Sequence, residues 1–93
     1  MFTLMIFTSK TCGPCKSLKK WLTYNSVNAQ IEYVDCDEHV RLVSEHRIKS
    51  VPTILVLNDN DKVVKRFEGF SPQMCKELEA YLNKWQPLVV SLK

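Results

Sequence analysis

The sequence lacks the long apolar run of a membrane protein and the strong charge that often accompanies nucleic-acid binding. No stretch of its 93 residues approaches the about 20 consecutive apolar residues of a membrane-spanning helix. Residues 1–7 form a short apolar run with neither a basic start nor a small-residue cleavage site, so no secretory signal is visible. The net charge is only +3, which by itself gives no reason to expect a nucleic-acid partner. We therefore expect a cytoplasmic protein that binds neither membranes nor nucleic acid.

The sequence also lacks a second close pair of cysteines. Its four cysteines are Cys12, Cys15, Cys36 and Cys75, and only the first two lie near each other. A zinc site made of cysteines would want two such pairs, so we expect no metal and no bound cofactor. A disulfide framework would suit a small secreted chain, but nothing else indicates secretion. Cys36 and Cys75 are expected to be small hydrophobic residues, with a regulatory thiol role for Cys36 as the alternative.

Hydrophobic periodicity predicts alternating strands and helices in one α/β domain spanning residues 1–93, with 86–93 as a tail. Apolar or β-branched runs predict strands at 2–8, 31–34, 53–57 and 62–67, the last two forming a hairpin around 58–61. Capping chemistry predicts helices from Pro14 to about 24, from a cap at Asp37 to about 47, and from Ser71-Pro72 onward. The residues expected to face inward are Val40 and Val43 in the second helix, and Met74, Cys75, Leu78, Leu82 and Trp85 in the third.

The chemistry of the chain is concentrated in Cys12 and Cys15, which enclose Gly13-Pro14 at the start of the first predicted helix. Two thiols at this spacing can close into a disulfide and reopen. Unpaired backbone N–H groups at a helix amino terminus favour a thiolate, which is the form that attacks disulfides. The pair therefore predicts redox chemistry, with a permanent disulfide or half of a metal site as the alternatives.

These residues resemble the thioredoxin family over roughly residues 2–85. The resemblance rests on Cys12-Gly13-Pro14-Cys15 followed by Lys16, on Val51-Pro52-Thr53 downstream, and on Gly69 after the predicted hairpin. It implies the minimal thioredoxin fold, β-α-β-α-β-β-α, in which a four-stranded mixed sheet is flanked by three helices. It also implies a monomeric dithiol–disulfide oxidoreductase.

The resemblance assigns roles around the cysteine pair. Cys12 is expected to be the exposed nucleophile that attacks a substrate disulfide, and Cys15 the buried thiol that resolves the mixed disulfide. Gly13 and Pro14 are expected to tune the redox potential toward that of a reductant. Lys10 either favours the thiolate through its charge or is a solvated surface lysine.

The resemblance also implies a substrate-binding surface beside the cysteines. Val51 is expected to precede a cis Pro52 and to pair its backbone with an extended substrate, although an ordinary trans proline is the alternative. Gly69 and Phe70 would admit a partner's backbone and add an apolar contact, or would be a turn and a core residue. Thr11 joins this surface at a position where many thioredoxins have tryptophan.

One departure from the family concerns the proton of the second thiol. Many thioredoxins have a buried acid six residues before the first cysteine, and here Ile6 holds that place. Asp35 and Asp37 are too far along the next connection to be assumed in that role. We therefore expect Cys15 to lose its proton through water or through the Cys12 sulfur.

The resemblance implies an electron donor and a client. Electrons are expected to come from a thioredoxin reductase and to pass to protein disulfides, with ribonucleotide reductase as a candidate client. A glutathione-coupled, glutaredoxin-like enzyme is one alternative, because many glutaredoxins place a lysine near the position of Lys10. A thioredoxin-fold binding subunit that does not use its thiols is the other. His39 and His46 are expected at the surface without ligand partners.

Overall fold

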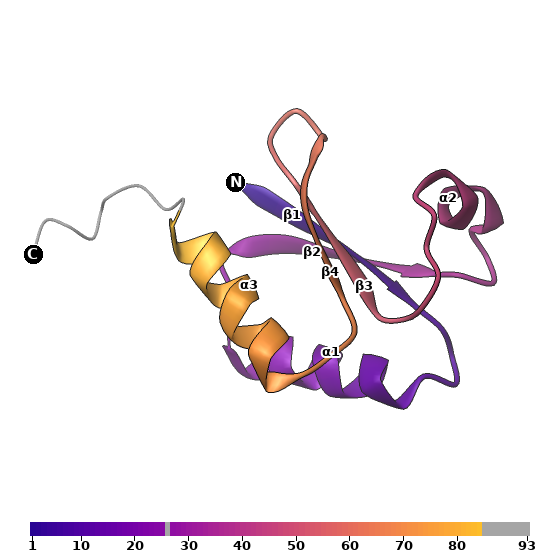
Figure 1. The fold of residues 1–93 in the computed structure, drawn as a ribbon, viewed down its shortest axis with the longest axis horizontal. Helices are drawn as coiled ribbons and strands as arrows, with labels where there is room; N and C mark the ends of the chain where they lie inside the picture. Colours follow the sequence, from indigo (N-terminus) through magenta and orange to yellow (C-terminus); the bar gives the residue numbers. More distant parts are fainter. Residues whose placement is uncertain (26, 85–93) are drawn as a thin grey trace, which may run out of the picture.

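A computed structural model describes residues 1–25 and 27–84 and contains one four-stranded sheet with helices on both faces (Figure 1). The elements follow in the order β1 (Phe2–Thr8), α1 (Gly13–Asn25), β2 (Ala29–Asp35), α2 (Val40–Glu45), β3 (Thr53–Leu57), β4 (Val63–Glu68) and α3 (Pro72–Lys84). The predicted β-α-β-α-β-β-α order is confirmed. Trp85 and the predicted tail 86–93 lie outside the described residues. None of the helices described is long and apolar enough to cross a membrane.

The sheet has the strand order β2-β1-β3-β4, with β1 and β3 at its centre. β1 is parallel to β2 and antiparallel to β3, and β4 is antiparallel to β3. Every residue of β3 is buried, and Leu4, Ile6 and Phe7 of β1 have no exposed surface. These continuous apolar runs form strands because both of their faces are covered.

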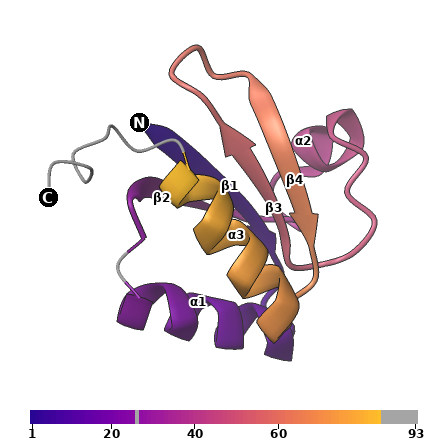
Figure 2. The same cartoon turned by 60° about the vertical axis from the view of Figure 1, so that its left-hand side comes forward.

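The two faces of the sheet carry separate core clusters. α1 and α3 cover one face and α2 covers the other (Figures 1 and 2). The first core cluster joins Leu4 and Ile6 of β1 to the buried side chains of α1 and α3, including Leu18 and Leu78. The second core cluster is smaller: Phe7, Val34, Leu55 and Leu57 are its buried members, and half-buried residues of α2 pack against it. The larger cluster therefore anchors the helix that carries the cysteine pair.

Two local structures that the sequence predicts are present, a hairpin and a helix cap. In the β3–β4 hairpin, the Asn58 side-chain oxygen accepts hydrogen bonds from the backbone N–H groups of Asn60 and Lys62, at 2.8 and 3.1 Å. At the start of α3, Ser71 Oγ accepts the N–H of Met74 at 3.1 Å, which is the expected amino-terminal cap.

The second helix differs from the prediction. Asp37 does not cap it: its backbone N–H donates to the side chain of Asp35 at 2.8 Å, and this turn delays the helix until Val40. Because the helix begins late and is short, Val40 points outward and is 68% exposed, so its predicted inward orientation is wrong. Val43 packs against the second core cluster as expected, together with Leu42.

The two histidines occupy different environments. His39 is exposed, as predicted. His46 is half-buried, with its ring 6.0 Å from that of Phe7, so its predicted surface position is wrong. It ends α2, and its carbonyl accepts a hydrogen bond from Arg66 of β4 at 2.6 Å, which holds this end of the helix against the sheet.

Leu78→Ala should lower the free energy of unfolding by about 2–5 kcal/mol, because it leaves a cavity where α3 packs on the sheet. Val40→Ala, on an exposed helix position, is the matched control and should change it by less than about 0.5 kcal/mol. Urea unfolding of the two variants measures both values. Equal losses would contradict the assignment of the core to the α1 and α3 face.

Candidate active site

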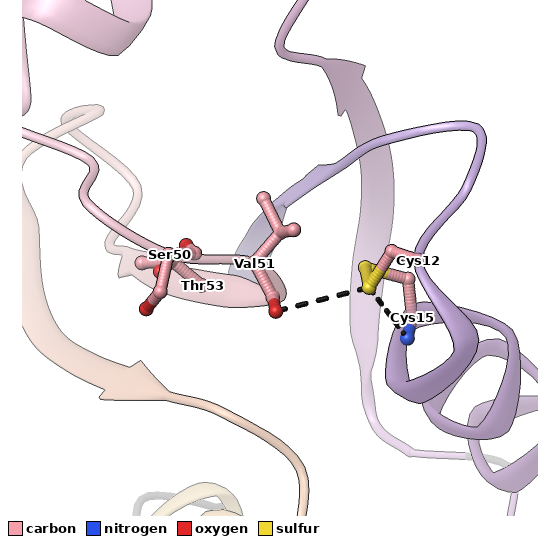
Figure 3. The surroundings of a disulfide bond; sticks show 5 residues. All are labelled: Cys12, Cys15, Ser50, Val51 and Thr53. Carbon is pink, nitrogen blue, oxygen red and sulfur yellow. Dashed lines mark hydrogen bonds between the residues drawn. A yellow bond between two sulfur atoms is a disulfide. The ribbon is translucent and has the colours of Figure 1, made fainter.

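α1 begins directly after Cys12 and places both active-site sulfurs at its amino end (Figure 3). Cys12 and Cys15 are joined by a disulfide, with their Cα atoms 5.2 Å apart. The backbone N–H of Cys15 donates to Cys12 Sγ at 3.0 Å, and the N–H of Lys16 reaches the Cys12 carbonyl at 3.4 Å. The Cys12 sulfur thus takes the place of a capping side-chain oxygen, where the helix favours negative charge.

The two sulfurs differ less in burial than expected. Cys12 is 8% exposed and Cys15 is 5% exposed, so the prediction that Cys12 is open to solvent is wrong for the disulfide form. One reason is the segment before β3, whose Val51 carbonyl oxygen lies 3.7 Å from Cys12 Sγ (Figure 3). The two cysteines differ instead in their neighbours: Cys12 Sγ faces Val51, whereas Cys15 lines a pocket that includes neither Cys12 nor Val51.

The segment beside Cys12 is held by one hydrogen bond within itself and one from Gly69. The Val51–Pro52 peptide bond is cis, as expected, and Pro52 is fully buried. Thr53 Oγ1 donates to the Ser50 carbonyl at 2.8 Å, and the N–H of Gly69 donates to the Pro52 carbonyl at 2.8 Å. Gly69 has a φ of +82°, a conformation that favours glycine. The structure thus brings Val51 next to Cys12 and ties Gly69 to Pro52.

The other predicted site residues lie in varied surroundings. Thr11 and Lys10 are exposed on the loop before α1, and Lys10 makes a long, exposed ion pair with Glu38, at 3.9 Å. Phe70 is half-buried and packs against the first core cluster, where it also lines an apolar pocket with Trp21. This position of Phe70 matches the core alternative, and its role toward a substrate stays a prediction.

A pocket of about 210 Å³ borders Cys15, and the sequence did not predict it. We call it the lysine pocket; it is lined by Thr8, Ser9, Lys10, Cys15, Lys16, Lys19 and Tyr33. The Lys19 ammonium lies 5.0 Å from the centre of the Tyr33 ring. The available signal was the alternation in β2, which puts Tyr33 on the same face as the core residue Ile31, toward α1.

Ile6 leaves the inner wall of the site without an acid. It is fully buried in the first core cluster and lies between Tyr33 of β2 and Ile54 of β3 in the sheet register. Within residues 1–25 and 27–84, no group of three or more His, Cys, Asp or Glu side chains could hold a metal ion.

The remaining cysteines are placed to be unreactive. Burial raises the pKa of the half-buried Cys36 thiol, and the nearby carboxylates of Asp35 and Asp37 raise it further. Burial also raises the pKa of Cys75 in α3, with a smaller contribution from Glu79. Both thiols therefore hold less thiolate near neutral pH than an ordinary cysteine does.

Brief alkylation of the reduced protein near neutral pH should modify Cys12 far faster than Cys36 or Cys75, by a factor of about ten or more. The amino end of α1 favours the Cys12 thiolate, whereas a raised pKa suppresses the other two. Their labelling should increase as the pH rises toward those raised values. Peptide mapping by mass spectrometry measures the three sites, and equal labelling of Cys12 and Cys36 would contradict the assignment.

Ile6→Asp should lower the free energy of unfolding by about 2 kcal/mol or more, because it buries an acid without a partner. The same change should speed the step in which Cys15 resolves a mixed disulfide, because a proton acceptor then stands beneath the cysteine pair. Thermal unfolding and stopped-flow kinetics measure the two effects. Ile6→Asn is the control that adds polarity without an acid; equal resolution rates in the two folded variants would contradict the prediction.

Comparison with known proteins agrees with this geometry. A model of the Thioredoxin family matches residues 2–84. Mitochondrial thioredoxin of Mus musculus is 34% identical over 82 residues, which are 84% of this chain and 48% of that protein. The SPbeta prophage-derived thioredoxin-like protein YosR of Bacillus subtilis is 33% identical over 67 residues, covering 72% of this chain and 81% of that protein.

A solved structure shows the same arrangement of elements. A mutant thioredoxin from Halobacterium salinarum superposes with a TM-score of 0.75 at 25% identity, covering 92% of this chain and 78% of that one. The chain spans about half the length of the mammalian mitochondrial thioredoxins that it matches. By its family match, its disulfide-bonded Cys12 and Cys15, and its sheet order, the chain belongs to the thioredoxin family.

Proposed function

We propose that this protein reduces protein disulfides by cycling Cys12 and Cys15 between a dithiol and a disulfide. The observation that carries the proposal is the disulfide at the amino end of α1, where a backbone N–H lies 3.0 Å from Cys12 Sγ. A permanent structural disulfide would need no such placement. Membership of the thioredoxin family supports the same interpretation.

The proposed reaction transfers two electrons in two steps. The Cys12 thiolate attacks one sulfur of the substrate disulfide, and the other substrate sulfur leaves as a thiolate that takes up a proton. The Cys15 thiol then loses its proton and attacks Cys12 Sγ. A bond forms between Cys12 and Cys15 while the bond from Cys12 to the substrate breaks, and the second substrate sulfur also takes up a proton. The substrate leaves with two thiols.

The geometry supports the roles proposed for Cys12, Val51 and Gly69. The N–H of Cys15 and the amino end of α1 stabilise negative charge on the Cys12 sulfur when it attacks as a thiolate. Val51, whose carbonyl lies 3.7 Å from that sulfur, is expected to hydrogen-bond the backbone of an extended substrate. Gly69 flanks this segment through its bond to Pro52 and leaves room for a partner's backbone.

The electron donor, client and location belong to the same proposal and rest on the sequence. We propose a thioredoxin reductase as donor, protein disulfides such as that of ribonucleotide reductase as clients, and the cytoplasm as the location. Insulin-disulfide reduction with thioredoxin reductase and NADPH tests the donor against glutathione with glutathione reductase. Activity only with glutathione would overturn the proposed donor, and no activity with either would overturn the proposed function.

Cys12→Ser should abolish insulin reduction, because the attacking sulfur is gone. Cys15→Ser should lower turnover by about a hundredfold or more and trap a mixed disulfide at Cys12, because only the resolving thiol is missing. Mass spectrometry of each variant with a disulfide substrate detects the adduct. Cys36→Ser is the control and should behave as the parent protein does. An adduct trapped by Cys12→Ser instead would reverse the assigned roles.

A further inference from the structure

The lysine pocket beside Cys15 has no role in the function as described so far. It lies between the end of β1, the first turns of α1 and the face of β2 that packs on that helix. Cys15 forms part of its wall, whereas Cys12 does not. Its volume of about 210 Å³ is ample for several water molecules, and Thr8, Ser9 and the lysines supply polar groups that would bind them. The residue that carries the resolving sulfur thus borders a space that water can enter.

The charges around the lysine pocket are mainly positive. Lys10, Lys16 and Lys19 line it, and no carboxylate does. Two carboxylates belong to residues beside the lining: Glu38 pairs with the lining residue Lys10 at 3.9 Å, and Asp35, the register partner of Thr8, accepts the N–H of Asp37 at 2.8 Å.

The inner strands add no charge to this side of the site. Ile6 of β1 and Ile54 of β3 are fully buried and apolar. Cys36, which directly follows β2, packs against the second core cluster on the opposite face. The three lysines that share the pocket lining with Cys15 would favour a thiolate there.

Tyr33 lines the pocket and lies beside Ile6, the position where many thioredoxins have a buried acid. It is the register partner of Ile6 across the β1–β2 pair, so it stands one strand away from the position that many thioredoxins give to an acid. Its ring lies 5.0 Å from the Lys19 ammonium. A cation over an aromatic ring is attracted to the face of that ring, so Tyr33 holds Lys19 at the pocket.

We propose that Lys19, held over Tyr33, stabilises the Cys15 thiolate in the resolving step and that the Cys15 proton leaves through water in the lysine pocket. The inference rests on the proposed function, because it concerns the second half of that reaction. The Cys15 S–H bond breaks, its proton passes to water, and the electron pair that remains on sulfur forms the bond to Cys12. Lys19 is a positioning residue here: it contributes charge and does not take the proton.

Tyr33 is assigned the role of support for Lys19 and not of base. Burial raises the pKa of its phenol, which favours the protonated form. A protonated phenol can donate a hydrogen bond to water or to a thiolate but cannot accept the proton of Cys15 as a phenolate would. Water in the lysine pocket is therefore the proposed acceptor of the Cys15 proton.

The first experiment measures the ionisation of Cys15 without turnover. In a full-length background of Cys12→Ser, Cys36→Ser and Cys75→Ala, the carbon-13 shift of the Cys15 β-carbon is followed as the pH is raised. Lys19→Met should move the pH of half-ionisation upward by about 0.5 to 1 unit, and Lys19→Glu should move it further. Lys20→Met, on the same helix but outside the pocket lining, is the matched control and should leave it unchanged.

Two further measurements separate charge from structure. High salt should shrink the difference between the parent and Lys19→Met, because it screens the ammonium. Tyr33→Leu should produce part of the Lys19→Met effect, and Tyr33→Phe, which keeps the ring, should produce little. Equal shifts for Lys19→Met and Lys20→Met, or no shift in Lys19→Glu, would overturn the proposal.

The resolving step gives a kinetic signature that a packing defect would not. With the cysteines intact, Lys19→Met should resolve a mixed disulfide about twofold to fivefold more slowly near neutral pH, since lost thiolate is partly offset by greater nucleophilicity. Above the pH of full ionisation it should be as fast as the parent or faster. If the parent protein reduces insulin but the ionisation of Cys15 does not depend on Lys19, this inference is wrong and the proposed function stands. An inactive parent with Lys19-dependent ionisation would overturn the proposed function and leave the assignment of Lys19 standing.

Discussion

The contact between the Cys15 N–H and Cys12 Sγ is the interaction on which the rest of this structure depends. At 3.0 Å it makes the Cys12 sulfur the amino-terminal cap of α1, so the atom that exchanges disulfide bonds also caps the start of the helix. This arrangement needs a helix fixed in place. Leu18 and Leu22 supply that by packing α1 into the first core cluster, and β1 carries the chain from the centre of the sheet to the turn where the cap forms.

The sheet completes the site by bringing two distant segments to the same end of the molecule. Val51 and Pro52 come just before β3, and the Val51 carbonyl lies 3.7 Å from Cys12 Sγ. Gly69 follows β4 and bonds back to Pro52. Since β1, β3 and β4 are adjacent strands, these three connections meet beside the sulfurs. The two sides of the site differ in their neighbours: Val51 borders Cys12, and the lysine pocket borders Cys15.

Local features were predictable from the sequence, and features that depend on register or competing turns were not. The cysteine spacing, the Ser71 cap and the Asn58 hairpin each act within a few residues, so each is visible in the sequence. The predicted start of α2 at Asp37 was wrong because the Asp35 side chain accepts the Asp37 N–H and forms a turn ahead of the helix. Tyr33 and Lys19 were missed because their meeting depends on how β2 aligns with β1 and how α1 lies across both. The burial of Cys12 depends on Val51, which lies 39 residues away along the chain.

The reduction potential of the Cys12–Cys15 disulfide tests the central claim most directly. The protein is equilibrated in dithiothreitol or glutathione buffers of defined potential, and trapped thiols are counted by mass spectrometry. The account predicts reversible two-electron behaviour with a midpoint near that of thioredoxin, about −270 mV, with Cys36 and Cys75 remaining thiols throughout. A midpoint above about −200 mV would indicate an oxidant, and a disulfide that resists every buffer would be a structural bond. Either result would contradict the account.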